Sequence, residues 1–220
     1  MFESSLKFIK CPNCNSKLDI EIYQSKEEIN EAILKCNKCQ SIFPIIDKIP
    51  IMFIDFKKYI SEHRVLSGKL YKLSSSNEIK KFLKLSLNNL KWNKIDKTKV
   101  EERWAKIYNT NKNNEFYKTI KSHIESIPKS KIVLEYGCSI GIITKYISNS
   151  SEKVFGIDKS FNAIQLAKNN AKRNVEYIVS DFASNPFKNN KFDLIIGLNI
   201  LELMEPNILL KQISKQISSG

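Results

Sequence analysis

Four of the five cysteines occur as two CxxC pairs, Cys11 with Cys14 and Cys36 with Cys39. Each pair is a short knuckle that directs two sulfur atoms at one point, and two knuckles supply four thiolates, a ligand set that suits tetrahedral Zn²⁺. Four thiolates leave no open coordination position, so we expect a structural metal. An iron centre with the same ligands stays open, as do four buried thiols or two disulfides.

A second group of chemically capable residues lies in the C-terminal half, where an apolar run ends in a glycine-containing turn. Residues 132–134 lead into Glu-Tyr-Gly-Cys-Ser-Ile-Gly at 135–141, and a helical pattern begins at Ile142. Strand, turn and helix in this order are the context of a nucleotide loop, because glycine lets the backbone approach a ligand and the helix start offers free N–H groups. The spacing differs from the dinucleotide-binding pattern GxGxxG.

Three further predicted strands also end in polar residues. The strands are 154–157, 175–179 and 192–198, and the residues that follow them are Asp158, then Asp181 with Phe182, then Asn199. An acid at the tip of the second strand can accept hydrogen bonds from ribose hydroxyls. Ligands of open parallel sheets bind at the carboxyl ends of the strands, so we expect these side chains to converge with the glycine turn.

The elements that position the cysteines are predicted to be short strands. Residues 18–22 alternate between apolar and polar, and apolar runs at 42–46 and 49–53 follow the second knuckle. A segment of ~50 residues is marginal as an independent core, so this module needs its metal.

Three amphipathic helices are predicted in the middle of the chain. The first two begin at capping boxes, Ser75 with Glu78 and Thr98 with Glu101, and the third ends before Pro128. The aromatic residues of the second and third helices are interpreted as core residues: Trp104, Tyr108, Phe116 and Tyr117. Of these, Tyr108 is the candidate for a ligand contact in a lid. The two histidines, His63 and His123, have no chemical partner nearby in sequence and are interpreted as satisfied or exposed.

The charge is concentrated in the segment that carries these helices. The chain of 220 residues has a formal charge of +13, and residues 57–131 hold 19 basic and 7 acidic residues, a net +12. A general bias towards Lys would spread the excess, so an anion-facing surface and a set of solvated helix faces both remain open. No apolar run approaches the ~20 residues that span a bilayer, and no secretory signal is present. We therefore expect a cytoplasmic protein with free thiols.

The N-terminal pattern resembles a known family. CPNC followed by CNKCQSIFPIIDKIPIMF is similar to the short zinc-ribbon family that activates tRNA, rRNA and protein methyltransferases or is fused to them. The match includes Phe43 to Ile45 and Ile49 with Pro50, and covers about residues 6–56. Lys48 departs from the family, which usually has glycine there.

The C-terminal half resembles the class I S-adenosylmethionine-dependent methyltransferases, of the methyltransferase type 11-like kind. VLEYGCSIG is similar to their first motif, with Ser139 in place of the middle glycine, and FDLIIGLNILELM is similar to their fourth motif. The resemblance implies that S-adenosylmethionine is the cofactor and that the following residues bind it: Glu135, Gly137, Cys138, Ser139 and Gly141 at the methionine part, Asp158 at the ribose, Asp181 and Phe182 at the adenine, and Asn199 near the reacting methyl group. Cys138 is interpreted as a small packing residue, and no catalytic base is assigned.

These observations predict an α/β protein with three parts. A zinc ribbon spans 1–56, a basic helical linker 57–97, and a Rossmann-like methyltransferase domain 98–220. The family usually continues beyond the position of Gly220, so we expect the last strands of the sheet to be missing and the chain to be truncated.

Three functions fit this organisation. The first is methylation of RNA (tRNA or rRNA), which would bind through the basic segment 57–131. The second is methylation of a small molecule or of a glycan- or lipid-linked metabolite, in which the ribbon only stabilises the fold. The third is a truncated, non-catalytic fragment that binds cofactor or a partner.

Overall fold

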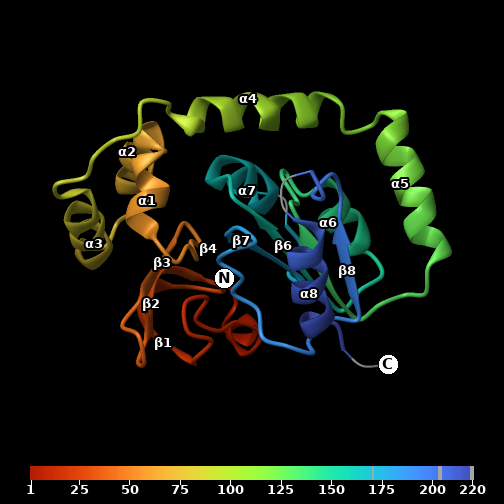
Figure 1. The fold of residues 1–220 in the computed structure, drawn as a ribbon, viewed down its shortest axis with the longest axis horizontal. Coiled ribbons are helices and arrows are strands. Elements are labelled where there is room, and N and C mark those ends of the chain that lie inside the picture. Colours follow the sequence, from red (N-terminus) through yellow and green to blue (C-terminus); the bar gives the residue numbers. More distant parts are fainter. Residues whose placement is uncertain (170, 203–204, 219–220) are drawn as a thin grey trace.

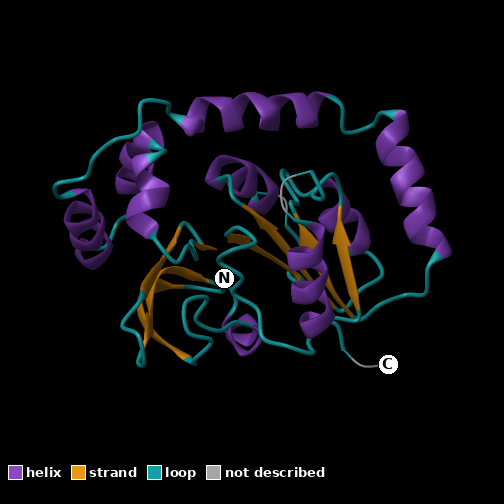
Figure 2. Cartoon of the chain, in the orientation of Figure 1, coloured by secondary structure: helices purple, strands orange, loops and turns teal. Residues whose placement is uncertain are grey.

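The structure is a computed structural model that describes residues 1–169, 171–202 and 205–218. It contains two four-stranded sheets, one antiparallel with the order β1-β2-β3-β4 and one parallel with the order β7-β6-β5-β8. Figure 1 shows the antiparallel sheet at the lower left, and Figure 2 shows a belt of helices that runs over the top of both sheets. The α/β class and the parallel sheet predicted from the sequence are confirmed.

The antiparallel sheet belongs to the cysteine module. Its elements are a short 3₁₀ helix η1 (Glu3–Phe8) and strands β1 (Leu18–Ser25), β2 (Ile29–Cys36), β3 (Ile42–Ile46) and β4 (Ile49–Pro50). The turn between β3 and β4 is formed by Asp47 and Lys48, whose φ angles of 53° and 66° lie in the left-handed region. Two left-handed residues suit a tight hairpin, and glycine would adopt this conformation without strain. The departure at Lys48 therefore falls on a position where glycine is the less strained residue.

Five helices cross from the cysteine module to the parallel sheet. They are α1 (Phe56–Ser61), α2 (Arg64–Leu73), α3 (Asn77–Leu87), α4 (Lys97–Thr110) and α5 (Glu115–Ser126). In Figure 1, α4 lies along the top of the molecule, between the group α1–α3 and α5.

The predicted capping boxes of α3 and α4 are wrong. Helix α3 is capped by Ser76, whose hydroxyl accepts from the backbone N–H of Ile79 at 3.2 Å, while Ser75 binds the buried carboxylate of Glu31. Helix α4 is capped by Asp96. In both cases a residue of the predicted box forms a hydrogen bond with a residue far away in the sequence. Local spacing does not predict such a partner.

The parallel sheet carries the polar strand tips. Its elements are β5 (Ile132–Tyr136), α6 (Ile142–Ile147), β6 (Lys153–Asp158), α7 (Phe161–Lys168), β7 (Val175–Val179), β8 (Leu194–Gly197) and α8 (Pro206–Gln216). The first three strands are nearly continuous apolar runs and are buried, as expected for strands covered on both faces. The strand order places β6 on one side of β5 and β8 on the other. The connections along the sheet therefore reverse direction at β5, beside the glycine turn. A ligand crevice forms at such a reversal.

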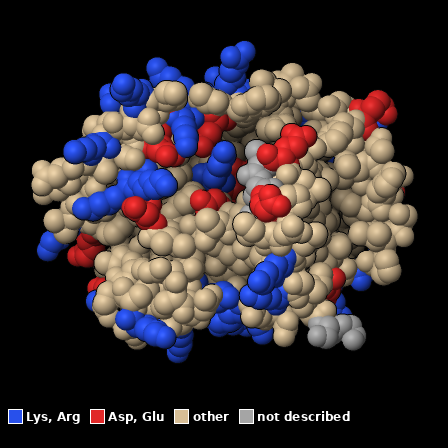
Figure 3. All heavy atoms as spheres, viewed as in Figure 1, with Lys and Arg blue, Asp and Glu red and all other residues tan. Residues whose placement is uncertain are grey.

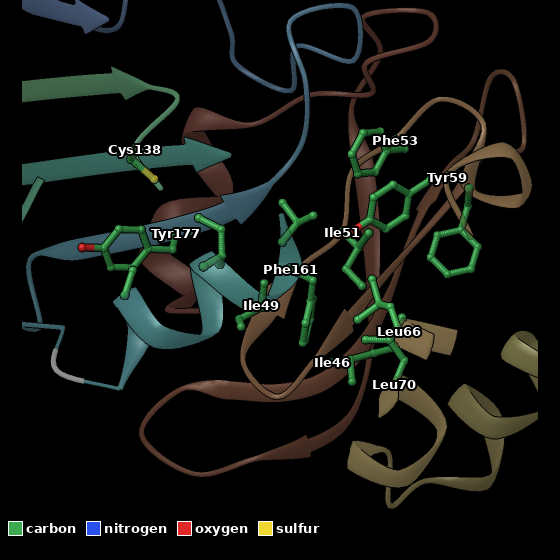
Figure 4. Close-up of a cluster of buried hydrophobic side chains, with 14 of the residues drawn as sticks. Ile46, Ile49, Ile51, Phe53, Tyr59, Leu66, Leu70, Cys138, Phe161 and Tyr177 are labelled. Atoms are coloured by element: carbon green, nitrogen blue, oxygen red, sulfur yellow. The ribbon is translucent and has the colours of Figure 1, made fainter. Parts of the chain in front are cut away.

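The cysteine module and the parallel sheet share one core. The backbone of Ile51 forms a parallel bridge with Val179, and the N–H of Met52 donates to the Val179 carbonyl at 2.8 Å, so the module extends the sheet at β7. Figure 4 shows the buried cluster that joins the parts, with side chains from the module (Ile46, Ile49, Ile51, Phe53), the first two helices (Tyr59, Leu66, Leu70) and the parallel-sheet half (Cys138, Phe161, Tyr177). The three segments therefore pack as one body.

Buried charges reinforce this junction. Glu176 of β7 is fully buried and accepts hydrogen bonds from the Phe2 backbone at 2.7 Å and the Ser5 hydroxyl at 2.9 Å. The ammonium groups of Lys153 and Lys168 lie 3.6 and 3.8 Å from its two carboxylate oxygens. A buried carboxylate is tolerated only with such partners, so this network fixes how the module sits on β7. In the described part of the chain, no helix combines the length and apolar character needed to cross a membrane.

Candidate functional site

The four cysteines of the two knuckles converge, with all of their sulfur atoms within 4.8 Å of one another. The knuckles have the same backbone geometry. In the first, Cys11 N–H donates to Ser16 and Asn15 N–H donates back to Cys11; Cys36, Gln40 and Ser41 repeat this arrangement in the second. The sulfur of Cys11 lies 3.5 Å from that of Cys39, and the sulfur of Cys14 lies 3.4 Å from that of Cys36. Tetrahedral Zn–S bonds of about 2.3 Å place sulfur atoms roughly 3.8 Å apart, so the donor set fits zinc.

The turn after β5 is held in a left-handed conformation at alternate residues. The φ angles of Gly137, Ser139 and Gly141 are 67°, 48° and 73°. At Gly141 a Cβ atom would lie 2.2 Å from the hydroxyl oxygen of Tyr177, so a larger residue would be strained and would force the Tyr177 ring to move. Ser139 adopts a conformation that costs a non-glycine residue about 1 kcal/mol. Its N–H donates to the Asp158 carboxylate at 2.9 Å, which ties the turn to the tip of β6.

Two carboxylates stand at neighbouring strand tips, the buried Glu135 and the half-buried Asp158. Asp158 also accepts from the Ser160 N–H at 2.8 Å, and its pKa is raised by burial and by the negative charge of Glu101. Glu135 accepts a hydrogen bond from the Thr144 hydroxyl, and burial raises its pKa to about 8. Burial disfavours the charged forms, so both groups are poised to gain from a cationic or hydrogen-bond-donating ligand.

A cavity of about 620 Å³ opens above these tips. The predicted cofactor residues that line it are Glu135, Gly137, Cys138, Ser139, Asp158 and Asn199. A smaller cavity of about 200 Å³ shares Gly137 and Asp158 and adds Asp181 and Phe182, and the Phe182 ring stacks on Tyr136 with centroids 4.9 Å apart. Gly141 lines neither of these cavities and faces a third, between α6 and α7.

The opposite wall of the large cavity comes from α4 and α5, and Tyr108 is the one residue of this wall that the sequence analysis named as a candidate for a ligand contact. Its residues are Glu101, Trp104, Ala105, Tyr108, Phe116 and Tyr117. The core interpretation of Trp104 and Phe116 is wrong, since they are 53% and 45% exposed. The reason is that α4 lies along the top of the molecule, and none of its residues, all of which the structure describes, belongs to the two buried hydrophobic clusters. Residues 101, 104, 105 and 108 share one helical face, which is the signal that could have identified this wall.

The interpretation of His63 as a satisfied histidine is confirmed, but its partner lies far away in the sequence. His63 is 3% exposed, and its Nε2 lies 3.0 Å from a carboxylate oxygen of Glu101. The two residues are 38 positions apart, so no local pattern joins them.

The charge of the large cavity is opposite to that of the chain. Its charged lining residues are four acids and one base: Glu101, Glu135, Asp158, Glu202 and Lys159. Figure 3 shows acidic side chains near the centre of this face, with Lys and Arg prominent on its left side and below. A cavity of this kind favours a cation.

Comparison with known proteins identifies the C-terminal part. Residues 133–220 match the family model described as a methyltransferase domain. The chain is 29% identical over 96 residues to the ubiquinone biosynthesis O-methyltransferase of Coxiella burnetii, covering 42% of this chain and 41% of that protein. It is 36% identical over 70 residues to the malonyl-[acyl-carrier protein] O-methyltransferase 2 of the same organism, covering 30% and 28%. The chain thus spans less than half the length of these curated relatives.

A solved structure shows the same fold. It is the complex between the Haloferax volcanii Trm112 methyltransferase activator and a methyltransferase, with a TM-score of 0.50 and 19% identity, covering 55% of this chain and 56% of that chain. Residues 133–220 thus match a methyltransferase-domain family model, and the chain shares the fold of that solved structure.

Proposed function

We propose that the protein is an S-adenosylmethionine-dependent methyltransferase that transfers the methyl group to an oxygen of a small, apolar molecule. The observation that carries this proposal is the large cavity: it lies at the carboxyl ends of the parallel strands, holds four acids and one base, and has a wall of aromatic residues. The cofactor carries a positive sulfonium and an ammonium, which an acid-lined cavity complements.

The residues of the strand tips suit the parts of this cofactor. Asp158 can accept from ribose hydroxyls. Glu135 becomes ionised when an ammonium approaches, because a nearby positive charge offsets the effect of its burial. Asp181 and Phe182 border the smaller cavity, which suits a flat base. S-Adenosylmethionine supplies the activated methyl group, and the protein aligns the acceptor with it and excludes water.

The acceptor side of the cavity is aromatic. Trp104 and Tyr108 lie on one face of α4 with ring centroids 6.1 Å apart, and Phe116 and Tyr117 face the cavity from α5. Aromatic walls favour an apolar or planar acceptor. The names of both curated relatives also describe O-methyltransferases, which supports oxygen as the methylated atom.

We also propose that the cysteine cluster holds a structural Zn²⁺ ion. The convergence of four sulfur atoms from two knuckles of equal geometry supports this proposal, and no position remains for a substrate.

RNA remains a second candidate because of the net charge of +12 on residues 57–131. Within this segment, Lys80 and Lys84 of α3 lie 5.9 and 5.7 Å from the Tyr71 ring centroid. The acidic lining of the cavity does not favour phosphate, and neither curated relative is named as an RNA enzyme. We therefore rank RNA below a small acceptor.

One experiment separates the two acceptors. Methyl transfer from labelled S-adenosylmethionine is measured with catechol as a hydroxylated aromatic probe and, separately, with unmodified tRNA. We expect label in the catechol product, and its loss in Asp158→Ala. Label in tRNA alone, with loss of transfer in a Lys80→Glu, Lys81→Glu, Lys84→Glu variant, would favour the RNA function. Absence of label from both probes would count against the proposal.

A further inference from the structure

Glu101 and His63 form a buried pair at the edge of the large cavity. The Nδ1 of His63 lies 2.7 Å from the Tyr59 carbonyl oxygen, so this nitrogen carries a proton and donates it. The Nε2 then faces a Glu101 oxygen at 3.0 Å, and this contact requires a second proton between the two groups. We interpret the pair as an imidazolium hydrogen-bonded to a carboxylate, in agreement with the raised pKa of His63.

Aromatic packing holds the His63 side of the pair in place. The His63 ring packs on Tyr59 with centroids 4.4 Å apart, and Tyr59 stacks on Phe53 at 4.0 Å. All three residues are buried. The second carboxylate oxygen of Glu101 has no hydrogen-bond partner among the described residues, and Glu101 lines the cavity.

Several contacts place Glu101 beside Asp158. The Tyr59 hydroxyl donates to the carbonyl of Lys159, the residue after Asp158, at 3.2 Å. On α4, Glu102 accepts from the Asn162 side chain at 3.1 Å, close to the same strand tip. The charge of Glu101 also contributes to the raised pKa of Asp158. Two carboxylates from different elements thus border one part of the cavity.

We propose that Glu101 is a second ribose-binding carboxylate and that His63 is its positioning residue. This inference rests on the proposed cofactor and extends it: the sheet supplies Asp158, and the covering helix α4 supplies Glu101. The cofactor then links the sheet to α4, which also carries Trp104 and Tyr108 of the acceptor wall. Binding of the cofactor would in this way organise the acceptor site.

The pair also makes cofactor affinity depend on pH. Charged or titratable groups around His63 are Glu101 on α4, Asp96 at the N-terminal cap of α4, Tyr59 on α1 and Glu62 at the C-terminal cap of α1. Burial lowers the pKa of His63, but the hydrogen bond and charge of Glu101 outweigh burial and raise it overall. Cofactor affinity should therefore fall as pH rises through the raised pKa of His63, because the neutral imidazole no longer donates a hydrogen bond to Glu101.

Calorimetry with two probes tests the role of Glu101. The probes are S-adenosylhomocysteine and its 2′,3′-dideoxy analogue. We expect Glu101→Gln to weaken S-adenosylhomocysteine about 10- to 100-fold, as for a charge-assisted hydrogen bond, and to leave the affinity of the dideoxy analogue unchanged. Glu102→Gln is the matched control and should retain the parent affinity. Equal losses of affinity for both probes, or a change in S-adenosylhomocysteine affinity below threefold, would overturn the proposal. A parent protein that binds S-adenosylhomocysteine but is inactive would contradict only the proposed reaction.

Variants of His63 test its positioning role. In His63→Gln the amide can still donate to Glu101, so affinity near pH 6.5 should be retained and the ratio of parent to variant affinity should fall between pH 6.5 and 8.5. His63→Leu should weaken binding across this range. Any pH dependence that arises from Glu135 cancels in this ratio, because Glu135 is present in both proteins. A ratio that does not change with pH, in variants that thermal unfolding shows to be folded, would contradict the role of His63.

Discussion

The cysteine cluster and the cofactor cavity are assembled over very different stretches of chain. The four thiols come from two knuckles within residues 11–39, and each knuckle folds through hydrogen bonds between near neighbours. The cavity takes its wall from α4 and α5 and its floor from the tips of β5, β6 and β8, over residues 101–202. A site of the first kind is encoded by spacing, whereas a site of the second kind depends on how the whole chain packs.

The packing between the cysteine module and the parallel sheet links the stability of the two regions. The cysteine spacing alone predicts that the ribbon can unfold while the downstream domain stays folded, as expected of a small module that depends on its metal. The structure instead joins the module to β7 by the Ile51–Val179 bridge and by a common buried cluster (Figure 4). Loss of the cysteine cluster should therefore also destabilise the region that forms the cofactor cavity.

The largest effect is expected from Cys36→Ser. Loss of a structural zinc ligand should lower the free energy of unfolding by more than about 3 kcal/mol, and the shared core should make the whole chain unfold together. Elemental analysis should find about one zinc per chain in the parent and much less in the variant. Cys138→Ser, which alters the cysteine outside the cluster, should keep the zinc. Unfolding of the ribbon alone would show that the two regions are independent.

Glu135 should make stability depend on pH. Its pKa is raised from 4.5 to about 8 by burial, so the folded state holds this proton more tightly than the unfolded state. The contribution of Glu135 to the free energy of unfolding is then greatest below pH 4.5 and is lost as pH rises through 8, by an amount on the order of 5 kcal/mol. Urea unfolding of the parent and of Glu135→Gln measures this, and the difference between them should grow with pH. A difference that is constant from pH 5 to 8 would contradict the raised pKa.

Asp158→Ala should weaken S-adenosylhomocysteine by about 1.5–3 kcal/mol, because ribose hydroxyls lose a charged acceptor. The backbone N–H groups of Ser139 and Ser160 also lose their partner, so the glycine turn should become less ordered. Asp193→Ala, an acid outside both cavities, is the control for affinity measured by calorimetry. Unchanged affinity in Asp158→Ala would show that another acid holds the ribose.

The smallest effects are expected at two left-handed residues, one in each region, where the family that the region resembles usually has glycine. Lys48→Gly in the hairpin and Ser139→Gly in the cofactor turn should each raise the free energy of unfolding by about 1 kcal/mol. Thermal unfolding checks both. Destabilisation by either substitution would mean that side-chain contacts outweigh the backbone strain at that position.

Much of the fold could be predicted from the sequence, because its signals are local. The apolar runs gave the parallel strands, and the residues after them gave the floor of the cavity, including Asp158 and Asn199. The cysteine spacing likewise gave the cluster.

The covering wall could not be predicted in the same way. The contact between His63 and Glu101 joins positions 38 apart, whereas local spacing predicts that Glu101 is part of a capping box. The exposure of Trp104 follows from the position of α4 along the top of the molecule, not from helical periodicity, which shows only that one face is apolar. Long-range packing decided these features.

The central claim is that the cavity at the strand tips binds S-adenosylmethionine, and chemical-shift mapping tests it most directly. Amide spectra of the labelled protein are recorded during titration with S-adenosylhomocysteine. The account predicts one binding site, with the largest shifts at Gly137, Ser139, Asp158 and Phe182 and smaller shifts on α4. Absence of shifts at these residues at millimolar ligand, or shifts confined to the cysteine module, would contradict it.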